Sequence, residues 1–281
     1  MYSCGLVLEG GGSRGIYTAG VLDAFMENGI EFPYVIGVSM GACSGASFLG
    51  KSIRRQHDVI LYSAQDKRYM SFANMRKSGE YCNFDWAFGE LSYDLFPLDQ
   101  DTFDKSDAVY CVVATNARTG KAEYFYPKSL RNECPEIRAS CSMPGVTKGL
   151  EIGGEVYFDG GLADSIPVKR AFEDGCEKAV AILTQHKGYV KPVTNRNFKK
   201  PFNNTYPLVG DAIINRSIIY NNQLEDVRRL EAEGKLLVIQ PLTPLNCTAL
   251  EKSPEKLEAI YQVAYTQGKQ YIEKVKAFME S

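Results

Sequence analysis

The chain has 281 residues, of which 44% are hydrophobic and 23% are charged, and its formal net charge at pH 7 is −2. This length and composition are typical of one large α/β domain, or of one domain with an extension. The near-neutral charge argues against a nucleic-acid partner bound by bulk electrostatics.

Eight cysteines are scattered along the chain, and none forms a C-x-x-C pair or lies at ligand spacing from a histidine. We therefore expect no metal site and interpret the cysteines as reduced, buried thiols of a cytoplasmic protein. Residues 1–6 lack the basic and apolar regions of a signal peptide. No apolar run reaches the ~18 residues of a spanning helix, so we expect neither secretion nor a transmembrane segment.

The first predicted elements are a buried strand at Leu6–Leu8, a glycine-rich segment, and an amphipathic helix that stops at Asn28-Gly29. A second buried strand follows at Tyr34–Val38. This β-loop-α-β order predicts the beginning of a parallel sheet.

The glycine-rich segment Gly10-Gly11-Gly12-Ser13-Arg14-Gly15 allows two interpretations. It fits G-x-G-x-x-G, but a dinucleotide fold requires an acidic residue at the end of the second strand, and Glu31 lies before that strand. Alternatively, consecutive glycine amides can point together at one oxygen and form an oxyanion hole. Arg14 would then add charge or brace the loop, unless it is an ordinary surface arginine.

The second strand leads directly into Gly37-Val38-Ser39-Met40-Gly41, a G-x-S-x-G sequence before a predicted helix. A serine on such a sharp turn exposes its hydroxyl, and glycine on either side removes Cβ clashes. The helix N-terminus behind it favours negative charge. The pentapeptide alone is equally compatible with a plain Gly/Ser turn.

Residues 45–52 match the P-loop pattern, but a P-loop begins at the end of a strand, whereas Gly45 falls inside the predicted helix. Residues 69–97 are rich in aromatic side chains. Ordinary core packing is the preferred interpretation of this segment, and a flap over an apolar pocket, or a surface that touches lipid, is the functional alternative.

The middle of the chain predicts a strand at Ala108–Thr115, an edge strand at Lys121–Tyr126, a short helix at Glu136–Ser142 and a hairpin over residues 150–158. The segment Asp159-Gly160-Gly161 directly follows the hairpin. An aspartate at the end of a strand is placed to meet a serine at the carboxyl edge of the same sheet. The alternative is a simple Asp-Gly turn.

Ser165 is predicted to cap a helix with Pro167 in its first turn, and a buried strand follows at Ala179–Thr184. Residues 187–207 are basic and interrupted by prolines, which predicts a loop and a boundary. We expect an acyl hydrolase domain at 1–190, and at 191–281 a mostly helical extension packed on the same domain. The extension contains helices at 208–233 and 254–281 and a strand at 236–239.

Four segments, in this order and at this spacing, resemble the motifs of patatin-like phospholipases: Gly10-Gly11-Gly12-Ser13-Arg14-Gly15, Gly37-Val38-Ser39-Met40-Gly41, Ala139-Ser140-Cys141-Ser142-Met143-Pro144 and Asp159-Gly160-Gly161. The resemblance extends over roughly residues 5–185. It implies a three-layer α/β/α fold with a mainly parallel central sheet, and an extension that some bacterial-type members carry.

The resemblance also implies the roles of the site residues. Ser39 would be the nucleophile and Asp159 the proton acceptor, with neither metal nor organic cofactor. Residues of the oxyanion and substrate-binding region would be Gly10, Gly11, Gly12, Arg14, Gly15 and Met40. The glycines Gly37, Gly41, Gly160 and Gly161 would support the two motifs. Met40 is bulkier than the alanine often found there, which narrows the expected pocket.

We therefore expect a serine acyl hydrolase of the lipase, phospholipase A or lysophospholipase type, acting on esters of lipids. Two alternatives remain open: a Ser39-Asp159-His186 triad in the α/β-hydrolase order, and a non-catalytic protein that binds acyl lipids on the same scaffold. Peripheral contact with a membrane and the oligomeric state are left open.

Overall fold

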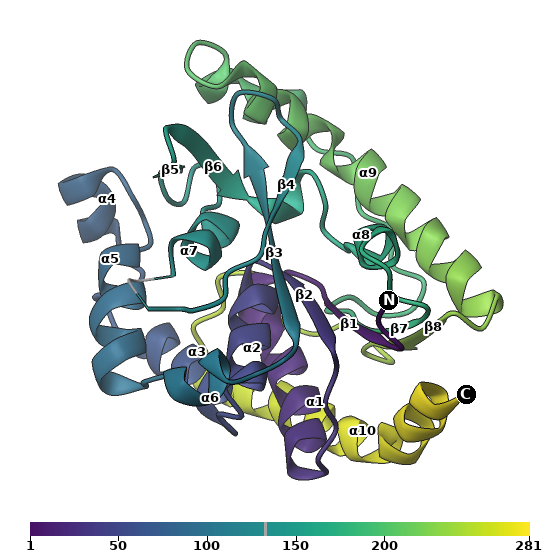
Figure 1. Cartoon of the computed structure of the whole chain (residues 1–281). Helices are drawn as coiled ribbons and strands as arrows, with labels where there is room; N and C mark the ends of the chain where they lie inside the picture. Colours follow the sequence, from purple (N-terminus) through teal and green to yellow (C-terminus); the bar gives the residue numbers. More distant parts are fainter. Residues whose placement is uncertain (132–133) are drawn as a thin grey trace.

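The computed structural model describes residues 1–131 and 134–281, which build one eight-stranded sheet (Figure 1). The strands are β1 (Gly5–Leu8), β2 (Tyr34–Val38), β3 (Val109–Asn116), β4 (Ala122–Phe125), β5 (Leu150–Ile152), β6 (Glu155–Asp159), β7 (Ala179–Ile182) and β8 (Leu236–Ile239). Their order is β5-β6-β3-β2-β1-β7-β8, with β4 also paired to β3. Strands β3, β2, β1, β7 and β8 are parallel neighbours, and β4, β5 and β6 pair antiparallel. The predicted mainly parallel sheet is confirmed.

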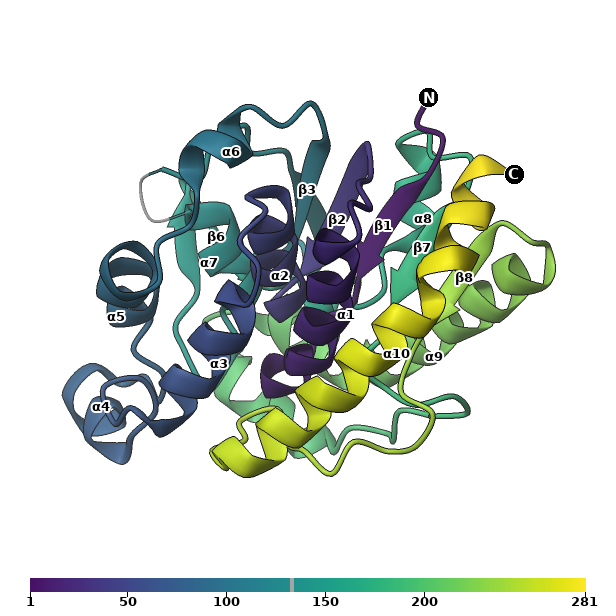
Figure 2. The ribbon, with the colours of Figure 1, turned by 90° about the horizontal axis from the view of Figure 1, so that it is seen from below.

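Helices cover both faces of this sheet. The α-helices are α1 (Ile16–Glu27), α2 (Met40–Leu49), α3 (Arg55–Gln65), α4 (Phe72–Ser78), α5 (Phe84–Trp86), α6 (Gln100–Asp104), α7 (Pro135–Cys141), α8 (Val168–Glu173), α9 (Pro207–Ala232) and α10 (Pro254–Glu280). Short 3₁₀ segments lie at η1 (Gly12–Gly15), η3 (Gly160–Leu162) and η4 (Arg196–Phe202), and η2 (Ala87–Leu95) is a π-helix. Figure 2 shows α1, α2, α3 and α10 on one side of the sheet and α8 and α9 on the other.

The side-chain alternation of the strands divides the core into two layers. In β1, Leu6 and Leu8 join the cluster that α1 and α10 cover, whereas Val7 joins the cluster that contains Tyr220 and Val227 of α9. A strand buried on both faces reads as a continuous apolar run, which is why β1 was recognisable in the sequence. The predicted three-layer α/β/α arrangement is confirmed.

The last ninety residues are built into this architecture. Strand β8 pairs in parallel with β7, and Ala179 lies opposite Leu236. Helix α10 packs along α1 so closely that a Cβ on Gly20 would lie 2.7 Å from the carbonyl oxygen of Tyr261, and one on Gly268 would lie 3.0 Å from the Cα of Val21. The extension therefore shares the sheet and both core layers with the rest of the chain.

The bounds of α8 and α2 bear on two features of the sequence, the predicted cap by Ser165 and the P-loop pattern. Helix α8 begins at Val168 with Pro167 as its N-cap, so the predicted cap by Ser165 is wrong: its hydroxyl instead donates to the carbonyl of Gly161 at 2.7 Å. Gly45 lies inside α2, away from any strand end, which removes the geometric basis of a P-loop.

In the part of the chain that the structure describes, no helix combines the length and apolar character needed to span a bilayer.

Candidate active site

Ser39 occupies the turn between β2 and α2 and has a strained backbone conformation. Its φ is 53° and its ψ is −126°, a region that L-residues rarely adopt. The flanking glycines make the turn possible. A Cβ on Gly37 would lie 2.7 Å from the backbone of Ala42, and one on Gly41 would lie 2.5 Å from the carbonyl oxygen of Leu8. The side chain is therefore held at the N-terminus of α2.

Asp159 meets Ser39 because β2 and β6 approach each other along one edge of β3. Strand β4 occupies the other edge, since Val113 and Ala114 both pair with it. On the shared edge, Val113 lies opposite Val38 and the next residue, Ala114, lies opposite Asp159. Ser39 directly follows Val38, so two antiparallel strand ends bring its hydroxyl and the Asp159 carboxyl together.

Burial dominates the electrostatics of this pair, because Ser39 is only 8% exposed and Asp159 only 4%. Loss of solvation raises the pKa of Asp159. The positive charge of Arg216, the Gly161 amide and a hydrogen bond from the Ser39 side chain act in the opposite direction and lower this pKa. The Gly161 amide donates to Asp159 Oδ1 at 2.7 Å. A buried carboxyl with a raised pKa, oriented by a backbone donor, is suited to accept a proton.

The glycine-rich loop lies directly beside Ser39. A Cβ on Gly10 would be 3.1 Å from the Cβ of Ser39, and one on Gly11 would be 2.8 Å from the hydroxyl oxygen of Thr184. Gly12 has a φ of +56°, which favours glycine. Within residues 1–131 and 134–281, the amides of Gly10 and Gly11 donate to no protein acceptor. They are available to an oxyanion, as is the amide of Met40 in the first turn of α2.

Gly15 and Gly160 are two further predicted site residues, and each lies against a neighbour that leaves no room for a side chain. A Cβ on Gly15 would lie 2.3 Å from Cγ of Met40, so this glycine makes room for the Met40 side chain. The Met40 sulfur accepts from Nε2 of Gln56 at 3.0 Å. Gly160 packs against the carbonyl of Val113, where a Cβ would lie at 2.2 Å. Both glycines have steric reasons to be there.

Ser140 also contacts the site, although the sequence indicated it only as part of the third motif. The Ser39 amide donates to the Ser140 hydroxyl at 2.8 Å, which holds the turn from the side of α7. The backbone amide of Asp159 donates to the carbonyl of Ser142 at 2.8 Å. The end of α7 therefore contacts both Ser39 and Asp159. Its place in the third motif was the available signal, but no pattern showed which atoms it would bind.

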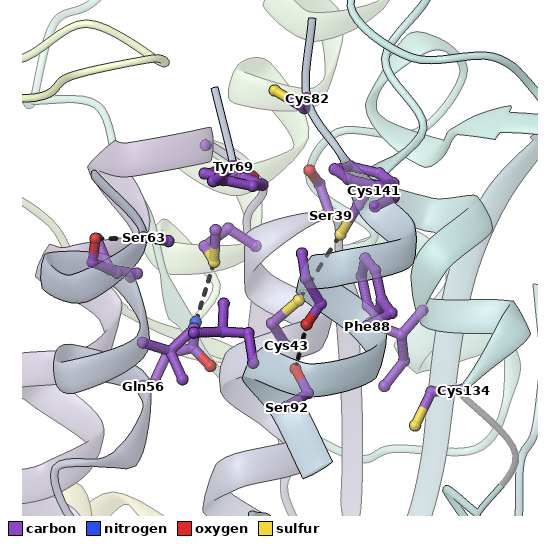
Figure 3. A pocket seen from close by; sticks show the side chains of 18 of the residues that line it. Ser39, Cys43, Gln56, Ser63, Tyr69, Cys82, Phe88, Ser92, Cys134 and Cys141 are labelled. Atoms are coloured by element: carbon purple, nitrogen blue, oxygen red, sulfur yellow. Dashed lines mark hydrogen bonds between the residues drawn. The ribbon is translucent and has the colours of Figure 1, made fainter. Parts of the chain in front are cut away.

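An apolar pocket opens from Ser39 along α2 (Figure 3). The cavity has a volume of about 130 Å³. Cys43 and Ala46 line it one and two helical turns beyond Ser39. The aromatic segment supplies the opposite wall, including Tyr69 and Phe88. The segment thus borders an apolar pocket, whereas its role as a flap, or as a surface that touches lipid, stays a prediction.

Sulfur atoms gather where this pocket meets Ser39. The Sγ atoms of Cys43 and Cys141 are 3.7 Å apart, the contact that Figure 3 marks with a dashed line. Arg55 closes the pocket nearby, and its guanidinium donates to the Ser47 hydroxyl at 2.9 Å and to the Phe96 carbonyl at 2.8 Å. The Arg55 guanidinium is thus engaged with the protein, and the remaining lining of the pocket is mostly apolar.

The two histidines have other partners. His186 Nδ1 lies 2.8 Å from the carbonyl oxygen of the next residue, and its ring packs edge-on against Tyr189. His57 is buried, with its nitrogens 2.6 Å from Asp58 and 2.7 Å from Glu258. Across the described residues, neither ring hydrogen-bonds to Ser39 or Asp159.

Comparison with known proteins bears on the family and the fold of this chain. A sequence model of the patatin-like phospholipase family matches residues 6–172, and a model of a domain of unknown function (DUF6363) matches residues 206–280. An uncharacterized protein of Escherichia coli, YjjU, is 28% identical over 95% of this chain and 76% of its own length. The lysophospholipase nte1 of Aspergillus niger is 27% identical over 98% of this chain, which spans 18% of that protein. The crystal structure of VipD from Legionella pneumophila shares the fold, with a TM-score of 0.51 and 13% identity over 96% of this chain and 67% of that one.

Proposed function

Given that this chain belongs to the patatin-like phospholipase family and is a carboxylic ester hydrolase, we propose that it cleaves acyl esters of lipids with Ser39 as nucleophile and Asp159 as proton acceptor. The activity would be of the phospholipase A or lysophospholipase type. The observation that carries the proposal is the register on β3, where Val38 and Asp159 lie opposite consecutive residues. An apolar pocket that begins at the serine supports an acyl chain as the ligand.

The proposed reaction is acyl transfer in two steps. The Ser39 oxygen bonds to the ester carbonyl carbon while its proton passes to Asp159, and the carbonyl electrons form an oxyanion held by the Gly10 and Gly11 amides. Collapse of this intermediate breaks the ester bond, and the leaving alcohol takes the proton from Asp159. Water repeats the sequence on the acyl-serine, which releases the fatty acid and restores both residues.

The test compares the unaltered protein with the variants Ser39→Ala and Asp159→Asn. Two quantities are measured: labelling by a fluorophosphonate and the rate of hydrolysis of p-nitrophenyl butyrate. We expect kcat/KM to fall by at least ~10³-fold in both variants, because each removes a group that changes its bonds in the transition state. Ser44→Ala is a matched control, since this hydroxyl only donates to the Met40 carbonyl inside α2. Full labelling and turnover in Ser39→Ala would refute the assignment of the nucleophile.

The triad alternative makes a different prediction for His186. Its ring contacts the Lys187 carbonyl and the Tyr189 ring. We therefore expect His186→Ala to retain turnover within about threefold of the unaltered protein. A loss as large as that of Ser39→Ala would favour the triad. If the folded protein bound acyl chains but its Ser39 resisted the fluorophosphonate, the non-catalytic alternative would be favoured instead.

A further inference from the structure

Three cationic side chains, Arg14, Lys191 and Arg216, form one cluster, and Arg216 acts on the Asp159 carboxyl. Arg14 lies in η1, directly after the glycine loop. Arg216 of α9 donates from Nε to the carbonyl of Gly161 at 2.6 Å, and the amide of this glycine binds Asp159. Neither arginine lines the apolar pocket. The basic cluster is thus distinct from the residues that line the pocket.

Lys191 is the third cation, and α9 holds it in place. Its backbone amide donates to the Asn221 side chain at 2.8 Å, and its carbonyl accepts from the same side chain at 3.1 Å. Its Nζ lies 4.4 Å from the ring centre of Tyr220. Tyr220 is one helical turn after Arg216, so both residues lie on the same face of α9. The Tyr220 hydroxyl donates at 2.6 Å to Glu9, which directly precedes the glycine loop.

The cluster carries three positive charges, and the nearby carboxyls that act on it are those of Glu9 and Asp159. Glu9 is buried, and its two oxygens accept from Tyr220 and from the Thr184 amide, each at 2.6 Å. Within the chain that the structure describes, Arg14, Lys191 and Arg216 form no salt bridge. Nε of Arg14 is buried and has no hydrogen-bond acceptor.

The cations also repel one another. Burial and the charges of Arg216 and Arg14 lower the pKa of Lys191 to about 8, against the opposing effect of Glu9. A half-buried group of three like charges that forms no salt bridge is unfavourable by itself, and a bound anion would relieve it.

We infer that Arg14, Lys191 and Arg216 bind a phosphate group attached to the alcohol side of the ester that Ser39 attacks. The inference rests on the proposed function. Guanidinium groups match phosphate oxygens with paired hydrogen bonds, and an ammonium adds a compact charge. The acyl chain would enter the apolar pocket while the phosphate sits on the basic cluster. Arg216 and Lys191 lie beyond the stretch that matches the patatin-like model.

Two soluble substrates that differ only in the phosphate test this inference: 1-octanoylglycerol and 1-octanoylglycerol 3-phosphate. We expect kcat/KM to be at least tenfold higher for the phosphate-bearing ester. In Lys191→Gln the ratio of the two kcat/KM values should fall roughly tenfold, the effect of losing one charge-assisted hydrogen bond. Lys191→Arg should largely restore the ratio. Lys200→Gln, which removes an exposed charge from η4, is the matched control and should leave it unchanged.

Inorganic phosphate separates a headgroup site from a general anion site. If the cluster serves the substrate, phosphate should inhibit hydrolysis of the phosphate-bearing ester competitively, and more weakly in Lys191→Gln. Equal kcat/KM for the two esters, or an equal loss on both in Lys191→Gln, would overturn the inference and assign Lys191 a structural role. Fluorophosphonate labelling of Ser39 would still stand in that case, so failure of the subsite and failure of the hydrolase proposal are distinguishable.

Discussion

Asp159 is a carboxyl whose surroundings act on its protonation in opposite directions. Burial raises its pKa, while the Arg216 charge, the Gly161 amide and the Ser39 hydroxyl lower it. As proton acceptor it must be ionised, so activity is lost as the pH falls through its pKa. Because burial is the largest influence, that pKa lies above the ordinary aspartate value of about 3.9.

The first prediction concerns the acidic limb of the pH profile. We expect kcat/KM for p-nitrophenyl butyrate to decline on acidification around a pKa above the ordinary aspartate value. In Arg216→Gln the limb should move to higher pH, because removal of a positive charge destabilises the carboxylate. Arg228→Gln, which removes an exposed arginine of the same helix, should leave the limb in place. A limb that stays fixed or moves to lower pH in Arg216→Gln would contradict the assignment.

The second prediction concerns the backbone strain at Ser39. The φ of 53° with ψ of −126° costs a non-glycine residue about 1–3 kcal/mol. We expect Ser39→Gly to unfold at a temperature about 2–4 °C above that of Ser39→Ala for each kcal/mol relieved, although both variants are inactive. Ser44→Gly, in the interior of α2, should instead lower the unfolding temperature. Equal midpoints for Ser39→Gly and Ser39→Ala would mean that the turn stores no strain.

At the scale of elements, α2 both presents Ser39 and lines the apolar pocket. Cys43 and Ala46 follow Ser39 at helical spacing, so Ala46 lies about 10 Å along the helix from the serine. The segment from Tyr69 to Leu98 forms much of the remaining wall. Under the proposed function, the side chains on the far turns of α2 limit the length of the acyl chain that the pocket accepts.

The third prediction follows from this arrangement. Ala46→Leu should reduce kcat/KM for p-nitrophenyl palmitate about tenfold more than for p-nitrophenyl butyrate, because the added side chain overpacks only the distal part of the channel. Ala46→Ser preserves the volume and should leave the ratio within about twofold. An equal loss on both esters would indicate that the acyl chain takes another route.

At the scale of the whole molecule, residues 191–281 are joined to the remainder through the sheet and through the α1–α10 contact. Helix α10 buries Leu257, Tyr261 and Val275 in the same cluster as Leu6 and Leu8. The Tyr261 hydroxyl donates to Asp23 of α1 at 2.9 Å, and the Tyr17 hydroxyl of α1 donates to Gln267 at 2.9 Å. These contacts couple the extension energetically to the residues that precede it.

The fourth prediction is one cooperative unfolding transition in urea. The single tryptophan, Trp86, reports on the segment before residue 190, whereas far-UV circular dichroism is dominated by helices such as α9 and α10. The two signals should share one midpoint because the extension completes a common core. An earlier transition seen by circular dichroism alone would instead support an independently folding unit at 191–281.

The sequence by itself determined the apolar strands, the long helices and the glycine-flanked serine, because these depend on neighbours along the chain. Strands β2 and β8 have the bounds predicted for them, and the α/β class followed from the order of elements. The motifs also indicated Ser39 and Asp159 as candidates. The predicted helix cap by Ser165 was wrong for a different reason. Its hydroxyl donates to the carbonyl of Gly161, a contact in a tight turn that helix propensity does not encode.

Only the tertiary structure decided how distant segments meet. The antiparallel approach of β6 to the edge of β3 beside β2 is a matter of sheet order, which no local pattern specifies. The same holds for the aromatic wall of the pocket and for Arg216, whose contact with the Gly161 carbonyl joins residues that are 55 positions apart in the chain. Contacts of that range are set by how the layers pack together, and packing is a property of the whole chain rather than of any stretch within it.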